Sequence, residues 1–252
     1  MPEKMIEVFS RRPGRGEYLL SAARTAGWAE KSGAGRPSPS SPLPGQTERD
    51  GLRLLEAGCG LGAASKLLSE RLGAEVTGVD LDAELIDRAS LECPERCRFL
   101  CADVTALPFE DGSFDGVFSE AAFSVLPDRA DAAREYARLL NPGGRLIISD
   151  FCARRRPEPE LRALVRGVPC FEGVDTVRSY VETLEAEGFR TLEAGEDYGE
   201  FLKLIMYVGR EYSVRPDETG GFLAGSFGRA GDGGEFFKKA RMSWCRLILE
   251  KR

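Results

Sequence analysis

The 252-residue chain contains no histidine. This absence excludes Ser-His-Asp and Cys-His catalysis, and it removes both the commonest general base and the commonest zinc ligand. Any chemistry that the chain performs must therefore use carboxylates, tyrosine, lysine or cysteine, or depend on a bound cofactor.

An excess of basic charge and a long apolar run are missing as well. The chain has 35 basic and 41 acidic residues and a formal net charge of −6, so we expect no nucleic-acid substrate, which would need a basic surface. No apolar run approaches the ~20 residues of a membrane span, and residues 1–10 lack the apolar core of a signal peptide. We therefore expect a soluble, cytoplasmic protein without a membrane span.

Cysteine is present but does not form the pattern of a disulfide framework. The seven cysteines are odd in number and scattered, which fits a reducing compartment. Cys93, Cys97 and Cys101 recur every fourth residue, yet the segment passes from a helix end into a strand, so the three should not share a face. We expect no metal site.

The chain is organised around an apolar strand that runs into three alternating glycines, LLEAGCGLG at residues 54–62. Glycines at this spacing let a ligand lie against the backbone, and the helix that follows offers free N–H groups at its positive end. The pattern predicts a cofactor-binding loop.

The glycines alone leave two kinds of cofactor open. Gly58, Gly60 and Ala63 also satisfy the relaxed dinucleotide fingerprint, and Asp80 follows at ~20 residues, where a ribose-binding acid belongs. Glu56 favours the other interpretation, because an acid before the loop can neutralise an ammonium group and would repel a pyrophosphate. A cationic amino-acid tail therefore fits the loop better than NAD does.

Five motifs occur in the order and spacing of class I S-adenosylmethionine-dependent methyltransferases. They are EAGCGLG at 56–62, GVD at 78–80, ADV at 102–104, LPF at 107–109 with SFD at 113–115, and LNPGG at 140–144. Over roughly residues 52–150 the chain resembles most the small-molecule branch typified by the ubiquinone and menaquinone biosynthesis enzymes. The resemblance implies methyl transfer from S-adenosylmethionine to a small-molecule acceptor, with S-adenosylhomocysteine as product.

Strand and helix patterns alternate after residue 51, which implies parallel pairing through right-handed crossovers. We expect a doubly wound, Rossmann-like α/β domain whose seven-stranded sheet is mostly parallel, and the resemblance makes its last strand antiparallel. Expected strands are 52–57, 75–80, 97–102, 114–119, 145–150, 189–194 and 242–249, with helices at 63–72, 83–91, 128–140 and 175–187.

We divide the chain into residues 1–50, an N-terminal helical cap followed by a flexible linker, and 51–252, the methyltransferase domain. The cap helix should run from Gly14 or Gly16 to Ala26, and the linker over residues 31–50. Residues 195–240 form an insert between the last two strands, with an apolar stretch at 201–208, a glycine-rich loop at 220–234 and a short helix. We favour a substrate lid over a disordered segment for this insert.

The candidate cofactor residues lie at the carboxyl ends of the predicted strands. Asp80 can accept from both ribose hydroxyls, with a helix N-cap as its alternative role, and Asp103 can accept from the adenine amino group, with a turn as its alternative. Glu56 and the glycine backbone should hold the methionine tail. The full set is Glu56, Gly58, Cys59, Gly60, Gly62, Asp80, Leu81, Asp103, Val104 and Ser119.

Catalytic candidates are fewer, because the cofactor supplies the activated carbon and the protein contributes positioning and exclusion of water. The resemblance places Ser119 and Glu120 where the sulfonium meets the acceptor. An essential general base is not required by this chemistry. If one exists, Glu120, Asp150 and Tyr18 are the candidates.

Three alternatives remain at this stage. An NAD-binding oxidoreductase and a non-catalytic S-adenosylmethionine-binding protein are two of them. The third comes from CFEG at residues 170–173, which is similar to a stretch of arsenite methyltransferases. That family also needs a cysteine just after the glycine loop, where this chain has AAS at 63–65, so we expect Cys170 to be a pocket-wall or buried residue. The motifs fix neither the acceptor nor the oligomeric state.

Overall fold

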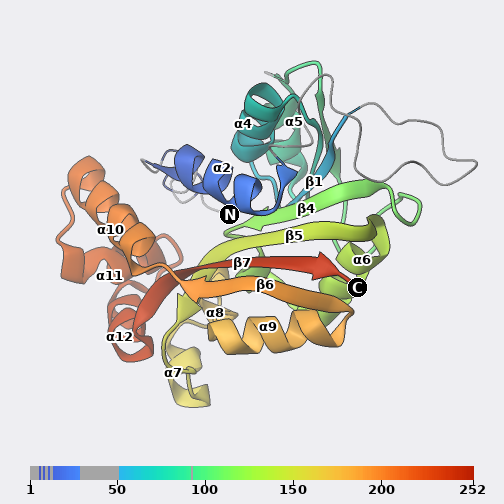
Figure 1. Ribbon diagram of the computed structural model, residues 1–252. Coiled ribbons are helices and arrows are strands. Elements are labelled where there is room, and N and C mark those ends of the chain that lie inside the picture. Colours follow the sequence, from blue (N-terminus) through green and yellow to red (C-terminus); the bar gives the residue numbers. More distant parts are fainter. Residues whose placement is uncertain (1–5, 7, 9–10, 12–13, 29–50, 92) are drawn as a thin grey trace, which may run out of the picture.

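The computed structural model describes Ile6, Val8, Arg11 and residues 14–28, 51–91 and 93–252. A seven-stranded sheet with the strand order β3-β2-β1-β4-β5-β7-β6 forms its centre (Figure 1). Strands β1 to β5 pair in parallel, whereas β7 is antiparallel to both of its neighbours, β5 and β6. The expected fold class is confirmed.

The strands are β1 (Arg53–Ala57), β2 (Glu75–Asp80), β3 (Cys97–Cys101), β4 (Phe114–Glu120), β5 (Leu140–Ala153), β6 (Phe189–Glu196) and β7 (Met242–Lys251). The helices are α2 (Arg15–Thr25), α4 (Ala63–Leu72), α5 (Ala83–Leu91), α6 (Arg129–Leu139), α7 (Pro159–Leu164), α8 (Pro169–Glu172), α9 (Val177–Ala186), α10 (Tyr198–Tyr212), α11 (Thr219–Gly225) and α12 (Ala230–Ala240), with short 3-10 turns η1 (Phe123–Val125) and η2 (Pro216–Glu218).

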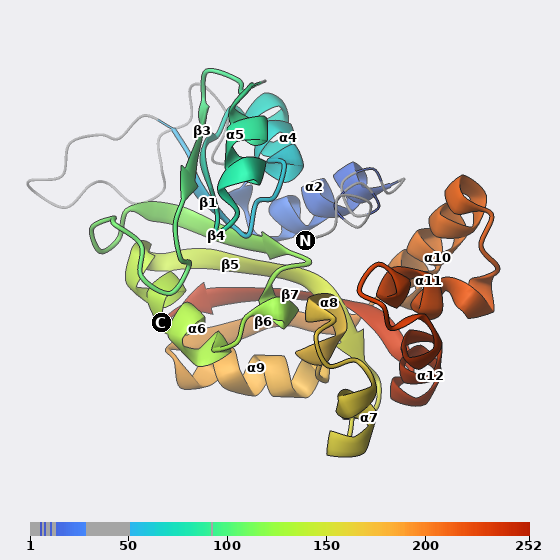
Figure 2. The same ribbon diagram turned by 180° about the vertical axis from the view of Figure 1, so that it is seen from behind.

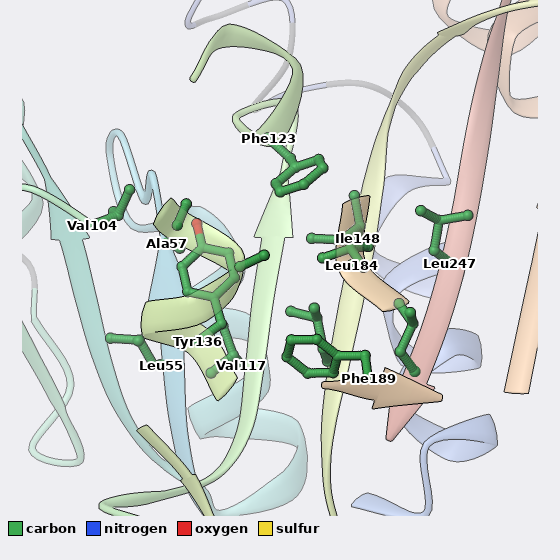
Figure 3. Packing of buried hydrophobic residues seen from close by; sticks show 14 of the residues in the cluster. Leu55, Ala57, Val104, Val117, Phe123, Tyr136, Ile148, Leu184, Phe189 and Leu247 are labelled. Atoms are coloured by element: carbon green, nitrogen blue, oxygen red, sulfur yellow. The ribbon is translucent and has the colours of Figure 1, made fainter. Parts of the chain in front are cut away.

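Neighbouring residues of the central strands enter different cores, because successive side chains of a strand point to opposite faces. Leu54 and Ile147 pack with α2 and α4. Leu55 and Ile148 pack with α6 and α9 on the other face, around the ring of Tyr136 (Figures 2 and 3). Continuous apolar runs such as those of β1 and β5 therefore follow from the burial of both faces.

A third core lies beyond the ends of the central strands, where α10, α11 and α12 gather (Figure 1). The apolar stretch 201–208 forms the buried face of α10, with Phe201, Leu204 and Val208 at helical spacing. This core also takes in residues of α8 and β7, among them Phe171 and Trp244.

The prediction of a glycine-rich loop at 220–234 is wrong, because most of this segment belongs to the helices α11 and α12. Its glycines let α11 and α12 approach each other closely. A Cβ built on Gly233 would lie 2.4 Å from the carbonyl oxygen of Gly220, and one on Gly221 would lie 2.5 Å from that of Ala230. Only glycine fits at such contacts, so the composition reflects helix packing rather than a loop.

The helix expected at 175–187 begins two residues later, as α9. Thr176 caps this helix by accepting a hydrogen bond from the Ser179 N–H at 3.2 Å. Asp175 instead lies 3.1 Å from the guanidinium of Arg162. The expected linker at 31–50 falls outside the described residues, and no helix that the structure describes is long and apolar enough to cross a membrane.

Candidate active site

A cavity of about 280 Å³ opens at the carboxyl ends of β1, β2 and β4, where ligands bind in open parallel sheets. Four segments contribute most of its described lining: the glycine loop, the turn after β2, the end of β4 and the start of α2. The residues from these segments are Glu56, Ala57, Gly58, Cys59, Gly60, Leu61, Asp80, Leu81, Asp82, Glu120, Ala121, Ala122 and Arg15.

The glycine loop is held by hydrogen bonds to β2. The Gly58 N–H donates to the Val79 carbonyl at 2.8 Å, and the Gly60 N–H donates to a carboxylate oxygen of Asp80 at 2.8 Å. Gly60 has a φ of +51°, which side chains rarely tolerate. A Cβ on Gly60 would meet no protein atom within 4 Å, so the backbone here is open to a ligand.

Glu56 lies at the end of β1 and is 2% exposed. One of its carboxylate oxygens accepts hydrogen bonds from both the N–H, at 2.8 Å, and the hydroxyl of Ser65 at the start of α4. Burial raises the pKa of Glu56 to about 7, although the Ser65 hydrogen bonds and the charge of Arg15 oppose the shift. An approaching cation would favour its ionised form.

Arg15, the first residue of α2, is a site residue that the sequence did not reveal. Its guanidinium lies 2.6 Å from the Glu120 carboxylate, and the two side chains are only 13% and 9% exposed. Glu56 also contributes to the raised pKa of Arg15. Arg15 is one of 35 basic residues, and nothing in its local spacing distinguished it; only a helix that folds over the sheet brings it into the cavity.

Of the predicted cofactor residues, seven line the cavity: Glu56, Gly58, Cys59, Gly60, Asp80, Leu81 and Val104. Gly62, Asp103 and Ser119 are not among the described lining. A Cβ on Gly62 would lie 2.3 Å from the ring of Phe99, so Gly62 serves close packing. Asp103 is exposed and accepts from the N–H and hydroxyl of Thr105, which lowers its pKa. The buried Ser119 hydroxyl has no hydrogen-bond partner among the described residues.

Of the three candidate bases, only Glu120 lines the cavity. Tyr18 is buried behind it, with the Arg246 guanidinium 5.3 Å from its ring, and burial raises the pKa of its phenol far above the usual range. Asp150 is fully buried. Its oxygens accept from the N–H and hydroxyl of Ser124, each at 2.8 Å, so it fixes the η1 turn rather than facing a ligand.

Part of the cavity wall is apolar and includes Trp244 of β7 together with Val125, Leu126 and Pro169. The indole N–H of Trp244 donates to the Ser149 hydroxyl at 2.8 Å, and its ring packs edge-on against Phe151 at 5.0 Å between centroids. Cys170, next to Pro169, is buried in the third core, and burial raises the pKa of its thiol to about 12.

Residues 55–148 match the family model described as "Methyltransferase domain". This part of the chain is a methyltransferase domain. It includes the glycine loop, both acids at the ends of β1 and β4, and Asp80, whereas Arg15 and Trp244 lie outside the matched region.

Curated relatives of the methyltransferase domain are methyltransferases as well. The chain is 33% identical over 150 residues to 2-methyl-6-phytyl-1,4-hydroquinone methyltransferase of Synechocystis sp., covering 55% of this chain and 46% of that protein. It is 36% identical over 107 residues to the chloroplastic tocopherol O-methyltransferase of Arabidopsis thaliana, covering 40% and 31%. The alignments thus cover about half, or less, of these relatives' own length.

Solved structures share the fold of the methyltransferase domain and of most of the chain. Phosphoethanolamine N-methyltransferase 2 of Haemonchus contortus, in complex with S-adenosyl-L-methionine, has a TM-score of 0.70 at 19% identity, covering 98% of this chain and 56% of that one. Geranyl diphosphate C-methyltransferase of Streptomyces coelicolor has a TM-score of 0.65 at 18% identity, covering 82% and 74%. At these identities the likeness concerns the fold.

Proposed function

We propose that the chain is an S-adenosylmethionine-dependent methyltransferase that acts on a small-molecule acceptor. The observation that carries the proposal is the glycine loop hydrogen-bonded to Asp80 beside the buried Glu56 and Arg15, all at one cavity. S-adenosylmethionine supplies an activated methyl carbon when it is bound. The protein's own contribution is to bind, to orient and to exclude water.

The charges of the cavity suit the cofactor's polar groups. Glu56 would neutralise the ammonium group of the methionine tail, and the Arg15 guanidinium would hold its carboxylate, since a planar guanidinium binds carboxylates through two parallel hydrogen bonds. Asp80 would accept from the ribose hydroxyls. Leu81 is 68% exposed at the cavity edge and Val104 is buried within it, and both offer apolar contact to the adenine.

The wall around Trp244 favours an acceptor with an apolar part. Among the described residues of the lining, no cation besides Arg15 is available to bind a phosphate group of the acceptor. The names of two relatives, for a phytyl hydroquinone and for tocopherol, suggest phenolic compounds with an apolar part. We therefore propose a largely apolar acceptor.

Calorimetric binding of S-adenosylhomocysteine, S-adenosylmethionine and NAD tests the cofactor assignment. We expect S-adenosylhomocysteine to bind, and Asp80→Ala to weaken that binding by about 1–3 kcal/mol through lost hydrogen bonds to a charged acceptor. Asp87→Ala is the control, because Asp87 is exposed on α5 and outside the described lining. Binding of NAD without S-adenosylhomocysteine would overturn the assignment.

An acceptor screen with released S-adenosylhomocysteine as readout tests the activity itself. We expect turnover with apolar phenols and none with phosphorylated amines. A protein that binds the cofactor tightly but methylates no member of a broad acceptor set would support the non-catalytic alternative.

A further inference from the structure

Tyr136 of α6 belongs to the lining of the cavity, although its ring lies in the core between the sheet and the helices α6 and α9. The ring shares this core with Leu55 and Val117 of the central strands, and its hydroxyl oxygen points toward Ala57, the last residue of β1 (Figure 3). Because the ring is packed against other side chains, the hydroxyl is the part of Tyr136 that reaches the cavity.

This hydroxyl makes no hydrogen bond with the part of the chain that the structure describes. Tyr136 is buried, and a buried hydroxyl without a hydrogen bond destabilises the folded protein. Burial, together with the charges of Asp103 and Asp150, also raises the pKa of the phenol well above its usual range. The group therefore stays protonated, and it can both donate and accept a hydrogen bond.

Tyr180 of α9 is a second buried tyrosine of the same core, and its hydroxyl is fully paired. It accepts a hydrogen bond from the Asp175 N–H at 3.0 Å and donates one to the Phe151 carbonyl at 3.1 Å. Tyr180 is outside the described lining of the cavity, whereas Tyr136 is part of it. Of these two hydroxyls, the one without a partner in the described chain is thus the one that a ligand can reach.

We propose that Tyr136 is a further cofactor-binding residue, whose hydroxyl forms a hydrogen bond with the adenosine part of the cofactor. This inference rests on the proposed function. Asp103, which the sequence suggested for this part of the ligand, is exposed and bonded to Thr105. Among the described residues of the lining, Tyr136 carries the only hydroxyl, and adenosine offers uncharged donors and acceptors that a neutral hydroxyl can match.

The position of Tyr136 favours the adenosine over the other parts of the ligands. Val104, which offers apolar contact to the adenine, lies in the same core as Tyr136. Glu56 and Arg15, which suit the methionine tail, lie on the other face of the sheet, where Glu56 is bonded to the start of α4. The apolar wall at Trp244 belongs to β7, and both β4 and β5 separate this strand from β1.

Calorimetry with two ligands tests which part of the cofactor the hydroxyl contacts. 5′-Methylthioadenosine has the adenosine and the thioether of S-adenosylhomocysteine but no amino-acid tail. Tyr136→Phe removes only the hydroxyl. This variant should weaken the binding of both ligands by the same factor, about three- to tenfold for the loss of one hydrogen bond.

Urea unfolding of the ligand-free protein separates this role from a structural one. Tyr136→Phe should unfold at the same urea concentration as the wild-type protein or at a higher one, because it removes a buried hydroxyl that has no partner in the described chain. Tyr180→Phe is the matched control. It should unfold at a lower urea concentration, since the Asp175 N–H and the Phe151 carbonyl lose their partner, and it should bind both ligands like the wild-type protein.

Three results would overturn the inference. Weaker binding of S-adenosylhomocysteine alone in Tyr136→Phe would assign the hydroxyl to the methionine tail, and unchanged binding of both ligands would show that neither uses it. A lower unfolding midpoint of ligand-free Tyr136→Phe would show that the hydroxyl has a structural role. Failure of the wild-type protein to bind either ligand is a different result, because it would reject the proposed function and this inference with it.

Discussion

The glycine loop and the aromatic cluster around Phe151 are built by different means. At the glycine loop, the backbone makes the site: the N–H groups of Gly58 and Gly60 donate to the Val79 carbonyl and to the Asp80 carboxylate of β2. In the aromatic cluster, side chains do so. Phe151 contacts Trp244, Phe171 and Phe201 with ring centroids between 5.0 and 6.4 Å apart, and this aromatic cluster supports the apolar wall.

This difference determines which of the two regions tolerates amino-acid substitution. A loop held by its own backbone depends on glycine at particular positions, whereas an aromatic cluster tolerates exchange of hydrophobic side chains of similar volume. The glycine loop can therefore keep binding the cofactor while the aromatic cluster is adapted to different acceptors. Substitutions in the loop should accordingly change cofactor affinity, and substitutions in the packed helices should change stability.

Gly60→Val should have the largest effect, a loss of S-adenosylhomocysteine affinity of about 100-fold or more. A branched side chain is strained at a φ of +51° and would occupy the open face of the loop. Gly73→Val is the control, because Gly73 has a similar φ of +65° with open space around it but lies at the end of α4, outside the described lining. Calorimetry should show normal S-adenosylhomocysteine affinity in the control. Equal losses of affinity in both variants would show that the loop is only a structural turn.

The region around the glycine loop was predicted well from the sequence because the patterns that indicate it are local. Alternation of apolar runs fixed β1, β2 and α4 to within a residue or two, and the glycine spacing located the loop. Arg15 was missed because its role depends on Glu120, which is far along the chain. The loop at 220–234 was wrongly predicted because the composition of this segment does not distinguish glycine in a loop from glycine in a close helix contact.

The second prediction concerns the pH dependence of stability. Burial raises the pKa of Glu56 from 4.5 to about 7. Between these pH values the folded protein holds a proton that the unfolded chain has released, so its free energy of unfolding falls as pH rises, by about 3 kcal/mol in all. Asp150, with its pKa raised by burial to about 6, acts in the same direction.

Urea unfolding at intervals between pH 4.5 and 7.5 measures this slope. Glu56→Gln should make the slope of the free energy of unfolding against pH shallower. Asp150→Asn should remove the separate contribution that Asp150 makes to this slope. Because the ammonium of S-adenosylhomocysteine favours ionised Glu56, the ligand should also bind more tightly as pH approaches 7. Identical slopes in the wild-type protein and Glu56→Gln would contradict the assignment of the raised pKa to Glu56.

The smallest effect is expected at the insert, where Gly233→Val should lower the free energy of unfolding by about 1–3 kcal/mol, the usual range for overpacking. Its Cβ would lie 2.4 Å from both the Ala224 Cβ and the Gly220 carbonyl oxygen, so α11 and α12 must move apart. Gly231→Val is the matched control, since Gly231 lies on the same helix with nothing within 4 Å of an added Cβ. Urea unfolding should separate the two variants, while S-adenosylhomocysteine affinity stays normal in both because neither glycine lies in the described lining of the cavity. Loss of that affinity in Gly233→Val alone would mean that the insert and the glycine loop form one cooperative unit. The geometry of the loop would then depend on the packing of α11 against α12.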